Sequence, residues 1–104
     1  MIISTTESIP NKEVIEILGL VKGNSVRAKS IRKDVSALMK NVIGGEIQTY
    51  TMLLEESRQQ AIERLIKDAS QQNADAIVNI RFTTSMVVEG ASEILAYGTA
   101  VKLK

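Results

Sequence analysis

The chain contains no cysteine and no histidine. These absences exclude disulfides, thiolate nucleophiles, Ser-His-Asp relays and the usual zinc sites, because each of these needs a thiolate or an imidazole. Aromatic side chains are scarce, with one Phe, two Tyr and no Trp, which leaves little surface for stacking the bases of single-stranded nucleic acid. Carboxylates remain as strong cation ligands, and they favour hard ions. We therefore expect no cofactor and no soft-metal site.

Long apolar runs are missing as well. No run approaches the roughly 20 residues that span a bilayer, and no basic segment followed by a long apolar one opens the chain. Neither a membrane span nor a secretion signal is expected, so a cytoplasmic location is the default. The 104 residues are 44% hydrophobic and 24% charged with a net charge of +1, which is globular composition. One domain covering residues 1–104 follows, because a second core would not fit in this length.

A helix pattern that starts at Tyr50 is the strongest signal in the chain. Its apolar residues recur at the three- and four-residue steps of an amphipathic helix: Leu54, Ala61, Ile62, Leu65, Ile66 and Ala69. The opposite side mixes charges of both signs and is expected to face solvent. Asn73 should end the helix, because Asn tolerates the left-handed conformation of a C-terminal cap. β-Branched Ile77 and Val78 then favour a strand.

Further strands and another helix are predicted around this central helix. We expect strands over residues 2–6 and Val14–Val21, a helix over Ser30–Val42, and a strand hairpin over Ala76–Val88 and Ile94–Leu103. Gly23-Asn24-Ser25 is expected to break the second strand. Gly44-Gly45 is expected to end the helix predicted over Ser30–Val42. The resulting ββααββ order predicts an α+β fold with a mainly antiparallel sheet and two helices.

The strand Val14–Val21 is apolar at both odd and even positions. Covering one face would leave Ile15, Ile17 and Val21 in water, and covering the other would leave Val14, Leu18 and Leu20 there. A domain with two helices has little else with which to cover both faces. We therefore expect the second cover to come from another copy of the chain.

Three groups of residues lie at distinctive spacing along the chain. They are Lys33-Asp34 with Val42-Ile43-Gly44-Gly45; Tyr50, Arg58 and Ala61; and Asn73-Ala74-Asp75-Ala76-Ile77-Val78 with Gly98-Thr99-Ala100-Val101. In combination they resemble the YbjQ-like family, small bacterial and archaeal proteins of unknown function that are often labelled heavy-metal-binding. The resemblance covers nearly the whole chain. It implies a dodecin-like α+β subunit that assembles as a homopentameric ring.

The family landmarks direct attention to the loop around Gly44-Gly45. The candidate ligand-binding residues are Lys33, Asp34, Gly44, Gly45 and Glu46, with no catalytic residue and no metal ligand assigned. Backbone N–H groups of the two glycines and the start of the following helix would attract a ligand such as an anion. The alternative is a tight helix connection that needs positive φ. Glu46 stands where the family usually has Arg, so an anion bound there by relatives should bind less well.

Two other patterns leave alternatives open. The carboxylates of Asp34, Glu46 and Asp75 would hold a hard cation or do acid-base work if two of them met in a dry cleft. The alternative is an ion pair or solvent exposure for Asp34 and a cap or turn bond for Asp75. The basic residues between Lys22 and Lys40 would attract small anions or nucleic acid. The net charge of +1 favours the other interpretation, in which they meet acidic residues of a neighbouring subunit.

Three functional classes follow, in order of preference. The first is an oligomeric ring that binds a small anionic ligand or a hard cation. The second is a structural or partner-binding scaffold without a ligand, and the third is an enzyme that uses carboxylates with a metal. The chain itself is the expected partner, whereas nucleic acid and membranes are not.

Overall fold

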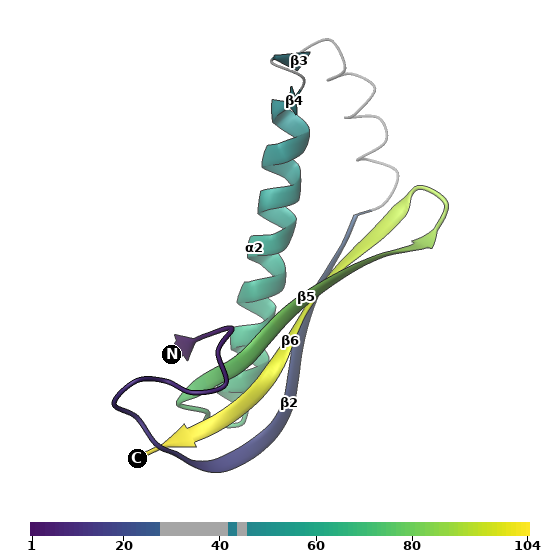
Figure 1. The fold of residues 1–104 in the computed structure, drawn as a ribbon. Helices are drawn as coiled ribbons and strands as arrows, with labels where there is room; N and C mark the ends of the chain where they lie inside the picture. Colours follow the sequence, from purple (N-terminus) through teal and green to yellow (C-terminus); the bar gives the residue numbers. More distant parts are fainter. Residues whose placement is uncertain (28–41, 44–45) are drawn as a thin grey trace.

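The computed structural model describes residues 1–27, 42–43 and 46–104, with side chains over residues 1–26 and 51–104. A four-stranded sheet contains, in order, β1 (Ile2–Ile3), β5 (Ala76–Val88), β6 (Ala91–Leu103) and β2 (Val14–Arg27). Helix α2 (Gln48–Gln71) packs across one face of this sheet, mainly on β2 (Figure 1). A short ladder of β3 (Val42–Ile43) with β4 (Glu46–Ile47) lies at the N-terminal end of α2.

The expected ββααββ order with two helices is wrong. Over the ranges that the structure describes, the chain has one helix, and its sheet is mixed because β1 runs parallel to β5 while β6 runs antiparallel to both neighbours. Val42, expected to end a helix, belongs to strand β3, and the rest of the helix predicted over Ser30–Val42 lies outside the described residues. The dodecin-like subunit with two helices is corrected accordingly, whereas the broad α+β class stands.

The central helix is confirmed and begins at Gln48. At its C-terminal end, Ala74 N donates to Ala69 O at 3.2 Å and Asn73 N donates to Ser70 O at 3.0 Å. Asn73 has a φ of 58°, which is the left-handed conformation that this pair of bonds requires. The asparagine therefore ends α2 as expected.

Strand β2 runs unbroken from Val14 to Arg27, so the expected break at Gly23-Asn24-Ser25 is wrong. Gly23 lies where the strand meets α2. A Cβ at this position would lie 2.2 Å from Leu65 N and 2.3 Å from Ala61 O. Because glycine has no side chain, the strand can lie directly against the helix backbone. Gly23 thus joins two elements closely instead of ending one of them.

The main core lies between α2 and the sheet. Ala61, Leu65 and Ala69 of α2 are fully buried. They pack against strand residues of β2, β5 and β6: Val21, Ile77, Ile80, Ile94, Ala96 and Ala100. A smaller cluster of Ala76, Val78 and Val101 packs with Ile9 and Leu103. Since alternate residues of a strand point to opposite faces, this second cluster lies on the face away from α2, where the segment after β1 covers it.

The β5–β6 hairpin is confirmed, with Glu89 and Gly90 between its strands. Gly90 has a φ of 80°, which suits the tight connection. The tip of the hairpin projects away from α2 (Figure 1), and its side chains from Arg81 to Glu89 are exposed. Among the described residues no helix combines the length and the apolarity that a membrane crossing needs.

Candidate functional site

The predicted ligand-binding residues fall mostly outside the described ranges. Lys33, Asp34, Gly44 and Gly45 all lie outside them. Glu46 is placed through its backbone alone, as the residue opposite Ile43 in the β3–β4 ladder. The grouping of these residues around one loop therefore stays a prediction.

Asp75 forms a structural bond at the end of the sheet. Its Oδ2 accepts the N–H of Leu103 at 2.9 Å, and its Oδ1 lies 3.6 Å from Nζ of Lys102. The pKa of Asp75 is lowered, first by the hydrogen bond from Leu103 and then by the charge of Lys102, because both favour the ionised carboxylate. The expected cap or turn bond of Asp75 is wrong, because its carboxylate bonds residues 27 and 28 positions later and ties the end of β6 to the start of β5.

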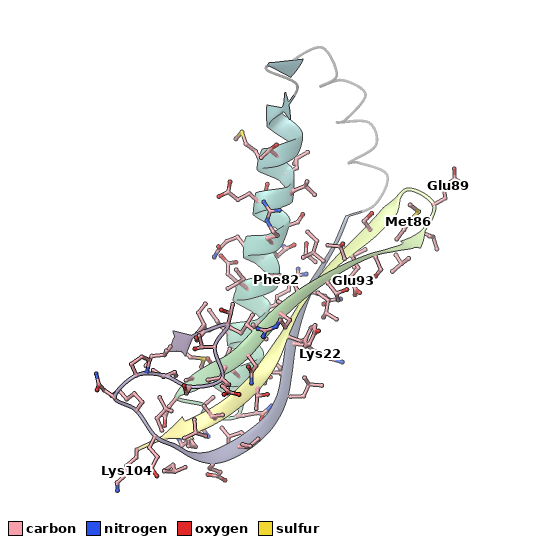
Figure 2. The ribbon with its side chains drawn as sticks, viewed as in Figure 1. Lys22, Phe82, Met86, Glu89, Glu93 and Lys104 are labelled. Carbon is pink, nitrogen blue, oxygen red and sulfur yellow. The ribbon has the colours of Figure 1, made fainter. Side chains whose placement is uncertain are left out.

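A cleft of about 430 Å³ lies between β2 and α2. Gly23, where the strand lies close to the helix, is one of its lining residues. Its charged and polar walls come from β2, α2 and β6: Lys22, Asn24, Arg64, Lys67, Asp68 and Glu93. Lys22 and Glu93 are labelled on the middle part of the sheet in Figure 2. The cleft therefore combines residues that are far apart in the sequence.

Hydrogen bonds between α2 and β2 fix the walls of this cleft. Asp68 Oδ2 accepts the backbone N–H of Lys22 at 3.0 Å, and Arg64 Nη1 donates to the carbonyl oxygen of Asn24 at 2.6 Å. Asn24 Nδ2 donates in turn to Glu93 Oε2 at 3.0 Å. Two backbone groups of this edge strand are thereby satisfied by helix side chains, which protects this part of the edge from pairing with another strand.

Positive side chains outnumber negative ones in the cleft, with Lys22, Arg64 and Lys67 against Asp68 and Glu93. Asp68 and Glu93 each accept a hydrogen bond, and Arg64 donates one. Within the described part of the chain, the ammonium groups of Lys22 and Lys67 have neither a hydrogen bond nor an ion pair. Groups of three or more potential metal ligands are absent from the described residues. The cleft is consequently suited to an anion more than to a metal ion.

Sequence reasoning assigned Arg64, Lys67 and Asp68 to a solvated helix face and missed their grouping with β2. A signal was present in their spacing, because residues three and four apart share one face of a helix and Gln71 extends the same row. The opposing strand residues gave no comparable signal. Gly23, whose close contact brings the two elements together, was interpreted as a strand breaker.

Comparison with known proteins places this fold in a family. The whole chain, residues 1–104, matches the YbjQ family described as "Putative heavy-metal-binding". A UPF0145 protein of Archaeoglobus fulgidus is 56% identical over 104 residues, which is 100% of this chain and 96% of that protein. A UPF0145 protein of Psychromonas ingrahamii is 57% identical over 104 residues, covering 100% and 99%.

A solved structure shares the fold. The crystal structure of a protein with unknown function of the DUF74 family, from Pediococcus pentosaceus, matches with a TM-score of 0.66 and 18% sequence identity. The match covers 100% of this chain and 98% of that chain. With the full-length family match and relatives above half identity, the chain belongs to the YbjQ-like family.

Proposed function

We propose that the chain is the subunit of a homo-oligomeric ring that serves as a small-ligand or ion-binding module. The observation that carries the proposal is the outer edge of β2 from Val14 to Leu20. In the described sheet β2 is a terminal strand, and Ile15, Ile17 and Leu20 are 58%, 71% and 70% exposed. A long apolar edge strand is a template for pairing with another chain, and soluble proteins rarely leave one uncovered.

The cost of leaving these side chains in water is large for a small domain. Full burial of one Leu or Ile is worth about 1.5 to 3 kcal/mol. Three such side chains therefore represent several kcal/mol, which is comparable with the roughly 5 to 15 kcal/mol of a whole domain. The Cα radius of gyration of 16.7 Å also exceeds the roughly 13 Å of a compact domain of 100 residues. Both values favour a subunit that completes its core against a neighbour.

A second uncovered surface supports a ring in particular. Met86, Val87 and Val88 at the hairpin tip are 73%, 53% and 64% exposed (Figure 2 labels Met86). At the edge of the sheet opposite β2, strand β1 and the segment after it bond to β5 as far as Ile80, so in the described residues the edge of β5 is open beyond that point, toward the tip. Two different open edges suit a head-to-tail contact, and such contacts form a ring where the rotation from one subunit to the next closes. The ring size of five rests on the family resemblance.

The ligand class follows from the donor groups of the chain. Soft heavy metals are selected by thiolate and imidazole ligands, and the chain has no Cys and no His. The residues therefore do not fit the heavy metals that the family description names. A small anion or a hard cation fits them better, because charged oxygen and nitrogen groups are the polar chemistry that the chain offers.

Size-exclusion chromatography with light scattering tests the assembly. We expect a single species of about five times the 11.4 kDa subunit mass, whereas an 11.4 kDa monomer at micromolar concentration would refute the proposal. Ile17→Asp should dissociate the ring or unfold the chain, and circular dichroism separates these two outcomes. Glu63→Lys, on the exposed side of α2, is the charge-changing control and should leave the mass unchanged.

Native mass spectrometry of freshly purified, tag-free protein tests the ligand in the same preparation. Extra mass retained on the ring would support the binding module. A ring without extra mass, both as purified and after incubation with phosphate or Mg²⁺, would favour a structural scaffold instead.

A further inference from the structure

Two lysines line the cleft between β2 and α2. Lys22 belongs to β2 and Lys67 to α2, and both are exposed. Within the described residues their ammonium groups form no hydrogen bond and no ion pair, whereas the carboxylates of Asp68 and Glu93 accept hydrogen bonds from strand β2. These hydrogen bonds hold the carboxylates in place without changing their charge, so the three cations of the cleft, Lys22, Arg64 and Lys67, exceed its two carboxylates by one charge.

We propose that this cleft binds a small phosphate-bearing anion between Lys22, Lys67 and the N–H groups of Arg64 that bond no other described residue. The inference rests on the ligand-binding half of the proposed function and names its ligand class. A guanidinium offers several N–H donors in a planar fork, of which Nη1 is the atom bonded to Asn24, so further donors remain for a phosphate oxygen. Charge-assisted bonds from lysine complete such a site.

The size of the cleft favours a molecule larger than a single ion. Its volume of about 430 Å³ falls within the roughly 300 to 1,000 Å³ of small-molecule sites. A cleft of this size accommodates a diphosphate or a phosphorylated metabolite. A lone chloride would contact only a fraction of its walls.

A long polyanion is disfavoured by acidic residues on the same helix. Glu55, Glu56 and Glu63 line a second, acidic hollow on α2 together with Gln59 and Gln60. Acidic and basic surfaces thus lie on one helix, and the acidic one would repel a nucleic-acid backbone that extended past the cleft. The net charge of +1 for the chain gives no general attraction for nucleic acid either. The ligand is therefore small.

Isothermal titration calorimetry with inorganic pyrophosphate tests the site. The titrations use full-length, tag-free protein at low ionic strength, because salt screens exposed charges. We expect saturable binding at one site per chain, weakened about tenfold by Lys22→Gln and by Lys67→Gln, as for the loss of one charge-assisted hydrogen bond. Lys12→Gln and Lys104→Gln remove the same charge from exposed lysines outside the cleft and should bind like the wild type; Figure 2 shows Lys104 at the end of the sheet away from the hairpin tip, whereas Lys22 lies on the middle part.

Several results would overturn the inference. Absence of saturable pyrophosphate binding to folded wild-type protein is one, and equal weakening by the Lys12 or Lys104 variants is another, since it would indicate a general charge effect. Citrate binding as tightly as pyrophosphate would refute the preference for phosphate. Light scattering on the same samples keeps this test separate from the assembly test: a ring that ignores pyrophosphate refutes the site, whereas a monomer that binds it refutes the ring.

Discussion

Alanine at Gly23 should destabilise the fold more than alanine at Gly19 or Gly98. The added Cβ would lie 2.2 Å from Leu65 N, 2.3 Å from Ala61 O and 2.7 Å from Arg64 C, and ordinary contacts between non-bonded carbon atoms need about 3.5 to 4.0 Å. All three atoms belong to the backbone of α2, so no side chain can rotate away. The helix must therefore move off β2 by roughly 1 Å or more.

The loss in folding free energy follows from the contacts between α2 and β2 that this movement would break. Overpacking a core typically costs about 1 to 3 kcal/mol when neighbours can adjust. Here the whole contact of α2 with β2 is disturbed, including the buried Val21 and the 2.7 Å bond from Ser25 Oγ to Gln60 Oε1, so we expect more than about 3 kcal/mol. For a domain of this size, each kcal/mol lowers Tm by about 4 to 8 °C. Gly23→Ala should accordingly lower Tm by more than about 12 °C.

Thermal and urea unfolding, followed by far-UV circular dichroism, measure this effect. All variants must be compared at one protein concentration, because assembly makes apparent stability concentration-dependent. Gly19→Ala is the matched control: its φ of 133° strains alanine, but the nearest atom to a new Cβ is Gln72 Oε1 at 4.0 Å. A Gly23→Ala variant no less stable than Gly19→Ala would show that the strand does not lie against the helix backbone.

Three further predictions rest on other parts of the molecule. Because the pKa of Asp75 is lowered in the fold, its carboxylate stabilises the protein above the unfolded pKa of about 3.9, and this contribution is lost as the pH falls through the folded pKa. Asp75→Asn should therefore be less stable than the wild type in urea at pH 7, and the difference in stability should close in acid. A difference in stability that does not change with pH would contradict this. Calorimetry on tag-free protein should detect no submicromolar zinc site, since thiolate and imidazole ligands are absent. Leu65→Ala should cost about 2 to 5 kcal/mol in urea unfolding, because Leu65 is fully buried between α2 and the sheet; a loss below 1 kcal/mol would contradict that packing.

Local signals in the sequence were sufficient for the helix and the hairpin. The helical period from Tyr50 depends on residues three and four positions apart, and the cap at Asn73 depends on its own backbone conformation. Both predictions match α2. The alternation from Ala76 onward likewise predicted β5 and β6. Elements whose stabilising contacts are local or repeat at a fixed period can be identified without knowledge of the fold.

Long-range contacts decided the features that sequence reasoning missed. Glycine has a low intrinsic propensity for strands, so Gly23 was expected to end β2. The backbone of Ala61 and Leu65, some forty residues later in the chain, lies so close that only a residue without a side chain fits there. The parallel pairing of β1 with β5 has no local signature, since it joins two residues at the start of the chain to Ala76 and Ile77. The cleft likewise depends on long-range bonds, because the side chains of Arg64 and Asp68 bond to strand β2, which lies much earlier in the chain.

The two halves of β2 differ in the groups that they present at the outer edge of the sheet. Around Lys22 and Asn24, side chains of α2 satisfy the outer edge of the strand and leave charged groups facing a cleft. From Val14 to Leu20, the exposed side chains are largely apolar and register shifts interrupt the pairing with β6. An edge protected by helix side chains resists strand addition, whereas an apolar, unprotected edge favours it. Under the two proposals made above, the surface for another subunit and the surface for a ligand lie along a single strand, so Ile17→Asp should affect assembly and Lys22→Gln should affect binding independently.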